Sequence, residues 1–154
     1  MEVYLASAAG LLSWCGKWRK IPTLLAHPTL LAACGADVAL ADSVNRLLYR
    51  QGRVSTLPPG VEVLRCWRNQ LLTLSSETNC LTLYDAHDYP LVTSPAGIRP
   101  CDCAIVDCQV IVCGCEDGCL HIFSLPDLRE IAAYPVPGCP MRVAADGGEL
   151  TCLS

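Results

Sequence analysis

The sequence predicts an all-β fold built from repeated, four-stranded antiparallel units. Three features of the 154 residues support this prediction. A hairpin pattern occurs four times, further short apolar runs follow each copy, and Pro or Gly separates those runs. Short apolar runs bounded by turn residues are typical of strands. Residues 43–50 have some helical periodicity, but alignment with the other copies favours a turn followed by a strand.

The clearest copy of the hairpin spans residues 110–123. Asp117-Gly118 is predicted to form a tight turn in it, because Gly accepts the positive φ that such a turn requires. The other copies begin at Val3, Val38 and Leu72. In each copy an apolar-x-apolar strand is followed by a residue that tolerates the left-handed conformation, and then by a second strand. These turn residues are Gly10, Asn45, Asn79 and Gly118.

Two further apolar runs follow each hairpin. The third runs are 21–25, 54–57, 90–93 and 130–134. Pro or Gly then ends the strand, because Pro cannot donate to a β-ladder. The fourth runs are 30–34, 61–67, 103–106 and 142–145. We therefore predict one domain, 1–154, with repeats near 3–37, 38–71, 72–110 and 111–149 and a fifth copy that opens at 150–154.

Two segments carry a resemblance to a known family. Residues 116–125 resemble the Asp-Gly hairpin of WD-repeat and YVTN-type propellers, and residues 81–85 resemble the strand that ends in Trp-Asp, with Tyr84 in place of Trp. The resemblance implies a β-propeller, in which four-stranded blades pack around an axis. No repeat has the family's Gly-His pair or a true Trp-Asp, so the resemblance transfers no functional residue.

The number of blades leaves two alternatives. Full blades are expected from Leu30, Val61 and Cys101, with a partial blade before them and two strands after them. A four-bladed ring would use 142–145 to complete the first blade, but it would leave 149–153 without a place. We therefore favour an incomplete ring that is a fragment of a longer propeller. Such an arc exposes the apolar faces of its end blades and favours self-association.

Composition excludes several classes of protein. The chain is 52% hydrophobic and 17% charged, which does not fit a disordered tail. Its basic residues are scattered, so we expect no nucleic-acid partner. No apolar run approaches the length of a membrane helix, so we expect no membrane association. Residues 1–5 lack the basic start of a signal peptide, and we expect a cytoplasmic protein.

The twelve cysteines are the most unusual feature of the composition. In a reducing compartment, Cys acts as a small buried hydrophobic residue, and we favour that interpretation. A two-residue turn at 107–108 would place Cys103 opposite Val112, so that Cys113 points to the other face. The two C-x-C pairs, Cys101/Cys103 and Cys113/Cys115, would then not converge on a metal. We therefore do not expect a metal centre in the cluster Cys101, Cys103, Cys108, Cys113, Cys115 and Cys119.

The other reactive residue types do not form a convincing site. Cys15 lacks the second thiol of a C-x-x-C redox motif, because Trp18 occupies that position. The three histidines, His27, His87 and His121, fall at non-equivalent positions of their repeats, so we do not expect them to form one metal site. The polar residues of one turn, Asp85, His87 and Asp88, are explained by turn formation alone. We therefore predict no catalytic, cofactor-binding or metal-binding residue, and no cofactor.

A non-catalytic protein-interaction scaffold is the function that this pattern favours. Its partners would bind the face of the disc through the loops that connect blades. Another protein, or a second copy through the exposed blade faces, is the expected partner. Two alternatives remain open: a lactonase-like or quinoprotein-like propeller enzyme with its site at the central channel, and a Cys-based metal or redox protein.

Overall fold

The structure, a computed structural model, describes residues 3–7, 10–22, 25–35, 37–146 and 149–153. Every regular element in this part of the chain is a β-strand. The first sheet comprises β1 (Val3–Ser7), β2 (Gly10–Trp14) and β3 (Trp18–Ile21). The second comprises β4 (Leu30–Cys34), β5 (Asp37–Asp42), β6 (Leu47–Arg50) and β7 (Arg53–Thr56).

Three more sheets follow in chain order. The third comprises β8 (Val61–Trp67), β9 (Gln70–Ser75), β10 (Cys80–Tyr84) and β11 (Pro90–Pro95). The fourth comprises β12 (Asp102–Val106), β13 (Gln109–Cys113), β14 (Cys119–Ser124) and β15 (Glu130–Pro135). The fifth pairs β16 (Arg142–Asp146) with β17 (Glu149–Leu153).

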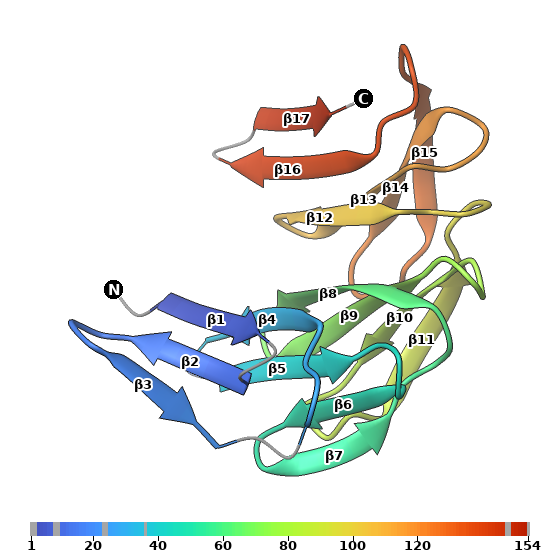
Figure 1. Ribbon diagram of the computed structural model, residues 1–154. Coiled ribbons are helices and arrows are strands. Elements are labelled where there is room, and N and C mark those ends of the chain that lie inside the picture. The colour runs from blue at the N-terminus through green and yellow to red at the C-terminus, as the bar shows by residue number, and fades with distance from the viewer. Residues whose placement is uncertain (1–2, 8–9, 23–24, 36, 147–148, 154) are drawn as a thin grey trace.

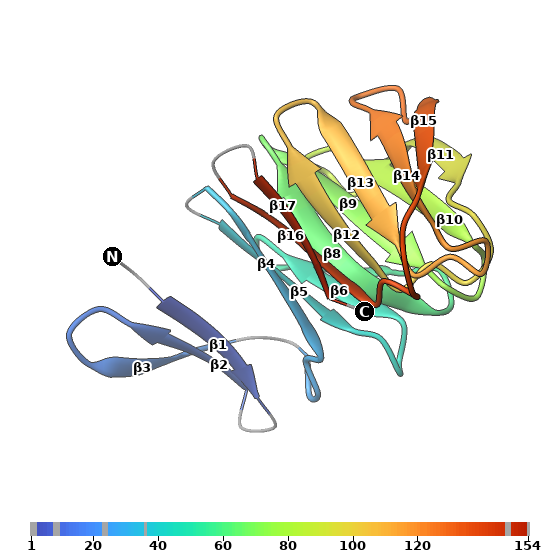
Figure 2. The ribbon, with the colours of Figure 1, turned by 90° about the horizontal axis from the view of Figure 1, so that it is seen from above.

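The sheets are antiparallel meanders that follow one another around an arc (Figure 1). The first strands of the second to fifth sheets contact one another in sequence: β4 contacts β8, β8 contacts β12, and β12 contacts β16. Figure 2 shows these four strands side by side, with the remaining strands of each sheet extending away from them. They therefore line the inside of the arc. The front face is defined here as the side at which they begin, and the back face as the side at which they end.

Apolar side chains fill the space between consecutive sheets. The largest core joins the third and fourth sheets, where Leu72, Leu74 and Leu83 pack with Val110, Val112 and Phe123. A similar core, which includes Leu48 and Leu64, joins the second and third sheets. Another, which includes Ile111 and Val143, joins the fourth and fifth sheets. Burial of these alternating side chains drives the stacking of sheets.

The predicted all-β, four-stranded repeat is confirmed, and three local predictions are wrong. The third strand of the first repeat was expected at 21–25, but β3 ends at Ile21, because Pro22 cannot donate to the ladder, and residues 23–24 lie outside the described residues. The connection between β13 and β14 spans 114–118 and is longer than a tight two-residue turn, with positive φ at both Gly114 (83°) and Gly118 (69°). The extra length lets Cys115 leave the strand and enter the core. Asn79 is left-handed as predicted, but Arg46 takes that role in place of Asn45. The Asn45 side chain instead bonds the Asp42 carboxylate at 2.7 Å.

Apart from the first, which begins with β1, each predicted repeat begins within the second strand of a sheet. In the structure, the segment 38–71 therefore contains most of β5, all of β6, β7 and β8, and the start of β9. The hydrogen-bonded sheets instead begin at Leu30, Val61 and Asp102. These positions agree with the blade starts inferred from the apolar runs to within one residue.

Candidate functional site

A polar pocket opens on the front face, where the first strands of four sheets begin. Its volume is about 280 Å³. The apolar part of the lining comes from β4 and β8, including Leu31 and Val63. The polar part comes from β8, β12, β16 and the residue before β12: Glu62, Arg65, Asp102, Arg142 and Cys101. These residues are far apart in sequence and meet because successive repeats place equivalent strand ends around one axis.

Asp102 joins three sheets beneath this pocket. Its buried carboxylate accepts a hydrogen bond from Arg65 Nη2 of β8 at 3.0 Å and from its neighbour Cys103 N at 2.9 Å. Its other oxygen accepts from Val143 N of β16 at 3.1 Å. Both carboxylate oxygens are therefore committed to holding β8, β12 and β16 together.

Two guanidinium groups lie at the rim of the pocket. The Arg65 side chain is 39% exposed and is held by Cys103 O, at 2.9 Å from Nε, as well as by Asp102. Arg142 is exposed, and its Nη1 donates to Met141 O at 3.0 Å. Glu62 accepts from Ser76 Oγ at 2.5 Å. The rim therefore combines a fixed cation, a more accessible cation and a carboxylate.

Cys101, which lines the pocket, carries a side chain that could act as a nucleophile. Burial raises the pKa of its thiol, although the nearby positive charge of Arg142 opposes the effect. The thiolate is therefore disfavoured at neutral pH, and a neutral thiol is a weak nucleophile. Beside it, Gly114 has no room for a side chain, because an added Cβ would lie 1.7 Å from Cys101 Sγ.

A second polar cluster lies on the hairpin between β13 and β14. His121 is buried on β14, and each ring nitrogen meets a carboxylate: Nδ1 lies 2.7 Å from Glu130 Oε1, and Nε2 lies 2.9 Å from Asp117 Oδ2. Burial disfavours the imidazolium, but hydrogen bonds and charges from Glu130 and Asp117 outweigh it and raise the pKa of His121. Cys115 lies beside them, and burial raises the pKa of its thiol to about 12.

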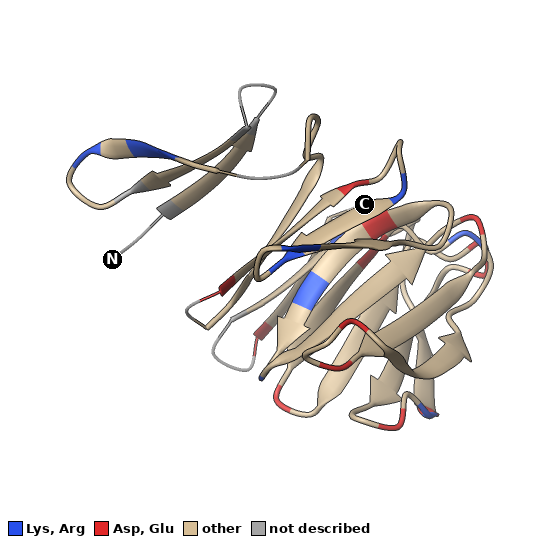
Figure 3. Ribbon diagram, turned by 90° about the horizontal axis from the view of Figure 1, so that it is seen from below, with Lys and Arg blue, Asp and Glu red and all other residues tan. Residues whose placement is uncertain are grey.

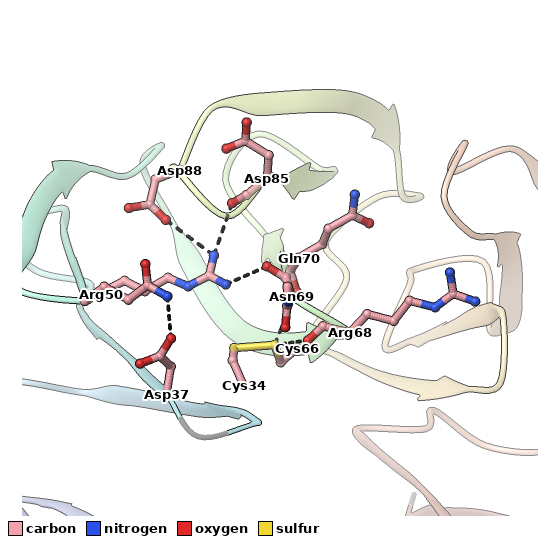
Figure 4. Close-up of a disulfide and its surroundings, with 10 residues drawn as sticks. Cys34, Asp37, Arg50, Cys66, Arg68, Asn69, Gln70, Asp85 and Asp88 are labelled. Carbon is pink, nitrogen blue, oxygen red and sulfur yellow. Dashed lines mark hydrogen bonds and ion pairs between the residues drawn. A yellow bond between two sulfur atoms is a disulfide. The ribbon is translucent and has the colours of Figure 1, made fainter.

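On the back face, a buried arginine holds the second and third sheets together (Figure 4). Arg50 of β6 is 1% exposed. Its guanidinium donates to Asn69 O at 2.6 Å and Asp85 O at 3.1 Å, and it pairs with Asp88 at 3.6 Å. Burial of a charge is costly unless it is paired and hydrogen-bonded. These contacts meet that requirement in part, because Arg50 Nε and Asp88 Oδ1 are buried without a hydrogen-bond partner among the described residues.

The interpretation of the cysteines as reduced core residues is only partly correct. Cys103 and Cys113 are fully buried, as expected for apolar filler. Cys34 and Cys66, however, form a disulfide between β4 and β8 (Figure 4). Their separation of 32 residues is close to one repeat, so they occupy comparable places on neighbouring first strands. That spacing was the signal in the sequence that could have identified the pair.

The structure separates most of the residues considered as candidate sites. Cys103 pairs with Val112 in the β-ladder, as predicted, and Cys103 and Cys113 enter different cores. Cys15 lies in the exposed turn between β2 and β3. His27 and His87 are exposed in connections, unlike His121. Asp85 acts as a turn residue, because its Oδ1 accepts hydrogen bonds from His87 N and Tyr89 N at 2.8 and 2.9 Å.

Charged residues are distributed over the described chain (Figure 3). Lys17, Arg19 and Lys20 lie at the hairpin of β2 and β3, away from the pocket residues Arg65 and Arg142 on β8 and β16. None of the described elements is a helix that could span a membrane.

No protein-family description matches the sequence, and no curated protein is a significant match. Solved structures do match. A catalytically inactive virginiamycin B lyase from Staphylococcus aureus with quinupristin has a TM-score of 0.71 and 14% identity, covering 98% of this chain and 59% of its own. The WD40 β-propeller domain of Doa1 has a TM-score of 0.68 and 13% identity, covering 92% and 53%.

The computationally designed Ika4 protein has a TM-score of 0.65 and 11% identity, covering 82% of this chain and 89% of its own. The chain therefore spans little more than half the length of the lyase and Doa1 chains and most of the designed one. At these identities the similarity shows the fold alone: the protein has a β-propeller fold of four-stranded blades.

Proposed function

We propose that the protein is a non-catalytic interaction scaffold that binds an acidic segment of another protein at the front-face pocket. The pocket itself is the observation that carries this proposal. Four sheets build it jointly, and it presents the guanidinium groups of Arg65 and Arg142 beside the apolar Leu31. Polar side chains that the fold places around a concave site give such a site its specificity.

The state of the polar side chains supports binding rather than catalysis. Both oxygens of Asp102 accept hydrogen bonds that join the sheets, so this carboxylate is a poor general base. Burial keeps Cys101 as a thiol by raising its pKa. These groups position the rim of the pocket, whereas Arg142 is exposed and able to meet a ligand.

The chemistry of the rim favours a carboxylate as the recognised group. A guanidinium binds a carboxylate through two parallel N–H···O bonds, which are stronger than neutral hydrogen bonds. Arg142 uses one donor on Met141 O, and Arg65 is already paired with Asp102. Arg142 is therefore the proposed anchor, and Arg65 and Glu62 shape the pocket around it.

A displayed peptide library tests this proposal. Peptides selected on the immobilised protein are expected to be enriched in Asp and Glu, and Arg142→Ala is expected to weaken their binding about 10-fold or more, the worth of a charge-assisted hydrogen bond. Arg129→Ala is the matched control, because Arg129 is an exposed arginine in the connection between β14 and β15 on the back face.

Two results would overturn the proposal. The first is selection of peptides without acidic enrichment that bind Arg142→Ala and the unmodified protein equally. The second is loss of binding in Arg129→Ala together with retention in Arg142→Ala.

A further inference from the structure

We propose that Cys115, Asp117 and His121 form a mononuclear Zn²⁺ site on the hairpin between β13 and β14. One ligand atom from each residue lies within 4.8 Å of the others. The set is C-x-D-x-x-x-H, and it differs from the C-x-C pairs, which the structure separates. The long connection at 114–118 creates the set, because it turns Cys115 inward toward the strand that carries His121.

The neighbours of His121 prepare it to coordinate a metal. Nδ1 lies 2.7 Å from Glu130 Oε1 of β15, so an N–H at that position donates to Glu130. Nε2 is the nitrogen that faces Asp117 and belongs to the ligand set. Metal-binding histidines almost always donate their other N–H to such an acceptor, which fixes the tautomer and the ring orientation. Glu130 is therefore a positioning residue and not a ligand.

Asp117 is oriented in a similar way. Its Oδ1 accepts a hydrogen bond from Cys119 N at 3.0 Å, which leaves Oδ2 directed toward His121. The Asp117 side chain is 51% exposed, whereas that of His121 is 11% exposed. The site is therefore reached from the side of Asp117.

Gly97, in the connection between β11 and β12, has no side chain to occupy the space next to Cys115 Sγ and His121 Nε2. A Cβ at this position would lie 2.6 Å from Cys115 Sγ and 3.5 Å from His121 Nε2. Any other residue would therefore fill the space that faces the sulfur and the imidazole nitrogen. The positive φ of Gly97, 87°, also favours glycine here.

The donor atoms select zinc among the common divalent cations. A thiolate, an imidazole and a carboxylate suit Zn²⁺, whereas Mg²⁺ and Ca²⁺ prefer sites made only of oxygen. Tetrahedral zinc with ordinary bond lengths separates such ligand atoms by about 3.4–3.6 Å. Asp117 Oδ2 and His121 Nε2 are 2.9 Å apart, so these two atoms need to separate by less than 1 Å to reach this geometry. A water completes the tetrahedron, and binding releases two protons to solvent: that of the Cys115 thiol and that on His121 Nε2, which Asp117 accepts as a hydrogen bond in the metal-free site.

Metal titration of the chelator-treated chain, with the Cys34–Cys66 disulfide intact, tests the proposal. Zn²⁺ is added in competition with a chromophoric chelator, and Co²⁺ is added separately because a thiolate–cobalt band reports cysteine coordination. We expect one metal per chain. Cys115→Ser is expected to abolish the cobalt band and to weaken Zn²⁺ binding by more than about 100-fold, and Glu130→Gln to weaken it about 10–100-fold.

Cys119→Ser is the matched control, since this thiol lies on the same hairpin outside the ligand set. Its Sγ donates only to the backbone Asp117 O, at 3.8 Å, whereas the Asp117 carboxylate is oriented by the backbone N–H of Cys119. It is expected to bind as tightly as the unmodified chain. The proposal is overturned if the folded chain binds no stoichiometric Zn²⁺, or if Cys115→Ser binds equally well, which would place the metal on exposed thiols such as Cys139.

Glu130→Gln decides the question if Cys115→Ser fails to fold, because Glu130 is half-exposed and outside the core. Unchanged Zn²⁺ binding in a folded Glu130→Gln protein would also overturn the proposal. The site is separate from the pocket at Arg142, so its failure leaves the proposed partner binding intact.

Discussion

Arg65 of β8 donates a hydrogen bond from Nη2 to Asp102 Oδ1 of β12 across 3.0 Å, at the floor of the front-face pocket. The same carboxylate accepts from the backbone of β16. One side chain therefore couples three sheets whose other contacts are mainly apolar.

Replacing Asp102 with Ala is expected to lower the free energy of unfolding by about 2–4 kcal/mol, because it leaves the buried amides of Cys103 and Val143 without their acceptor. Urea unfolding followed by circular dichroism measures this change. Glu149→Ala on β17 is the control, since Glu149 is exposed, and it should change stability little. Equal stability of the two variants would contradict the role assigned to Asp102.

Arg50→Met should be more damaging than substitutions at exposed arginines. Removal of the guanidinium leaves the nearly buried Asp88 unpaired, which costs about 3–5 kcal/mol. Neutralising the partner in the double variant Arg50→Met, Asp88→Asn should recover part of this loss, and a double-mutant cycle measures the coupling. Arg53→Met, on the neighbouring β7, serves as control. Additive effects of the two substitutions would argue against a coupled buried pair.

The Cys34–Cys66 disulfide is expected to contribute about 3–4 kcal/mol, the loop-closure value for residues 32 apart. Mass spectrometry after alkylation of the denatured, unreduced protein should show ten modified thiols of the twelve cysteines. Chemical unfolding with and without reductant should then differ in the unmodified chain but not in the double variant Cys34→Ser, Cys66→Ser. Alkylation of all twelve cysteines would show that the bond does not form.

Thiol reactivity should follow burial. Burial raises the pKa of Cys103 to about 12, so alkylation of this residue in the native protein should stay slow as the pH rises from 7 to 9. Cys108 lies in the exposed turn after β12 and should react readily. Residue-resolved alkylation rates provide the measurement. Comparable rates at the two positions would mean that the fourth sheet opens frequently or is packed differently.

Much of the fold was predictable because each repeat uses the same local signals. Alternating apolar residues and Gly or Asn turns defined the strands, and the register of Cys103 with Val112 followed from the length of one turn. The geometry of individual turns was harder to predict from the sequence. The connection at 114–118 is shaped by contacts with Cys101 and Gly97, which lie in the preceding connection and are brought close only by packing of the sheets.

The sites were less predictable than the strands, since they depend on contacts between repeats. Arg50 was not recognised as a buried residue because its partners Asn69 and Asp85 come from the next sheet. The alternation of side chains along single strands separates Cys103 from Cys113, and the structure confirms this separation. The pairing of Cys34 with Cys66 joins two blades, so alternation within one strand does not predict it.

Amide hydrogen exchange, measured with and without a selected acidic peptide, tests most directly whether the front-face pocket is the binding surface. Binding there should slow exchange in segments 61–65, 100–103 and 141–143, which surround the pocket. The back-face turns at 51–52, 85–89 and 107–108 should keep their exchange rates. Protection confined to those back-face turns, with no change around Arg142, would contradict the proposed binding surface.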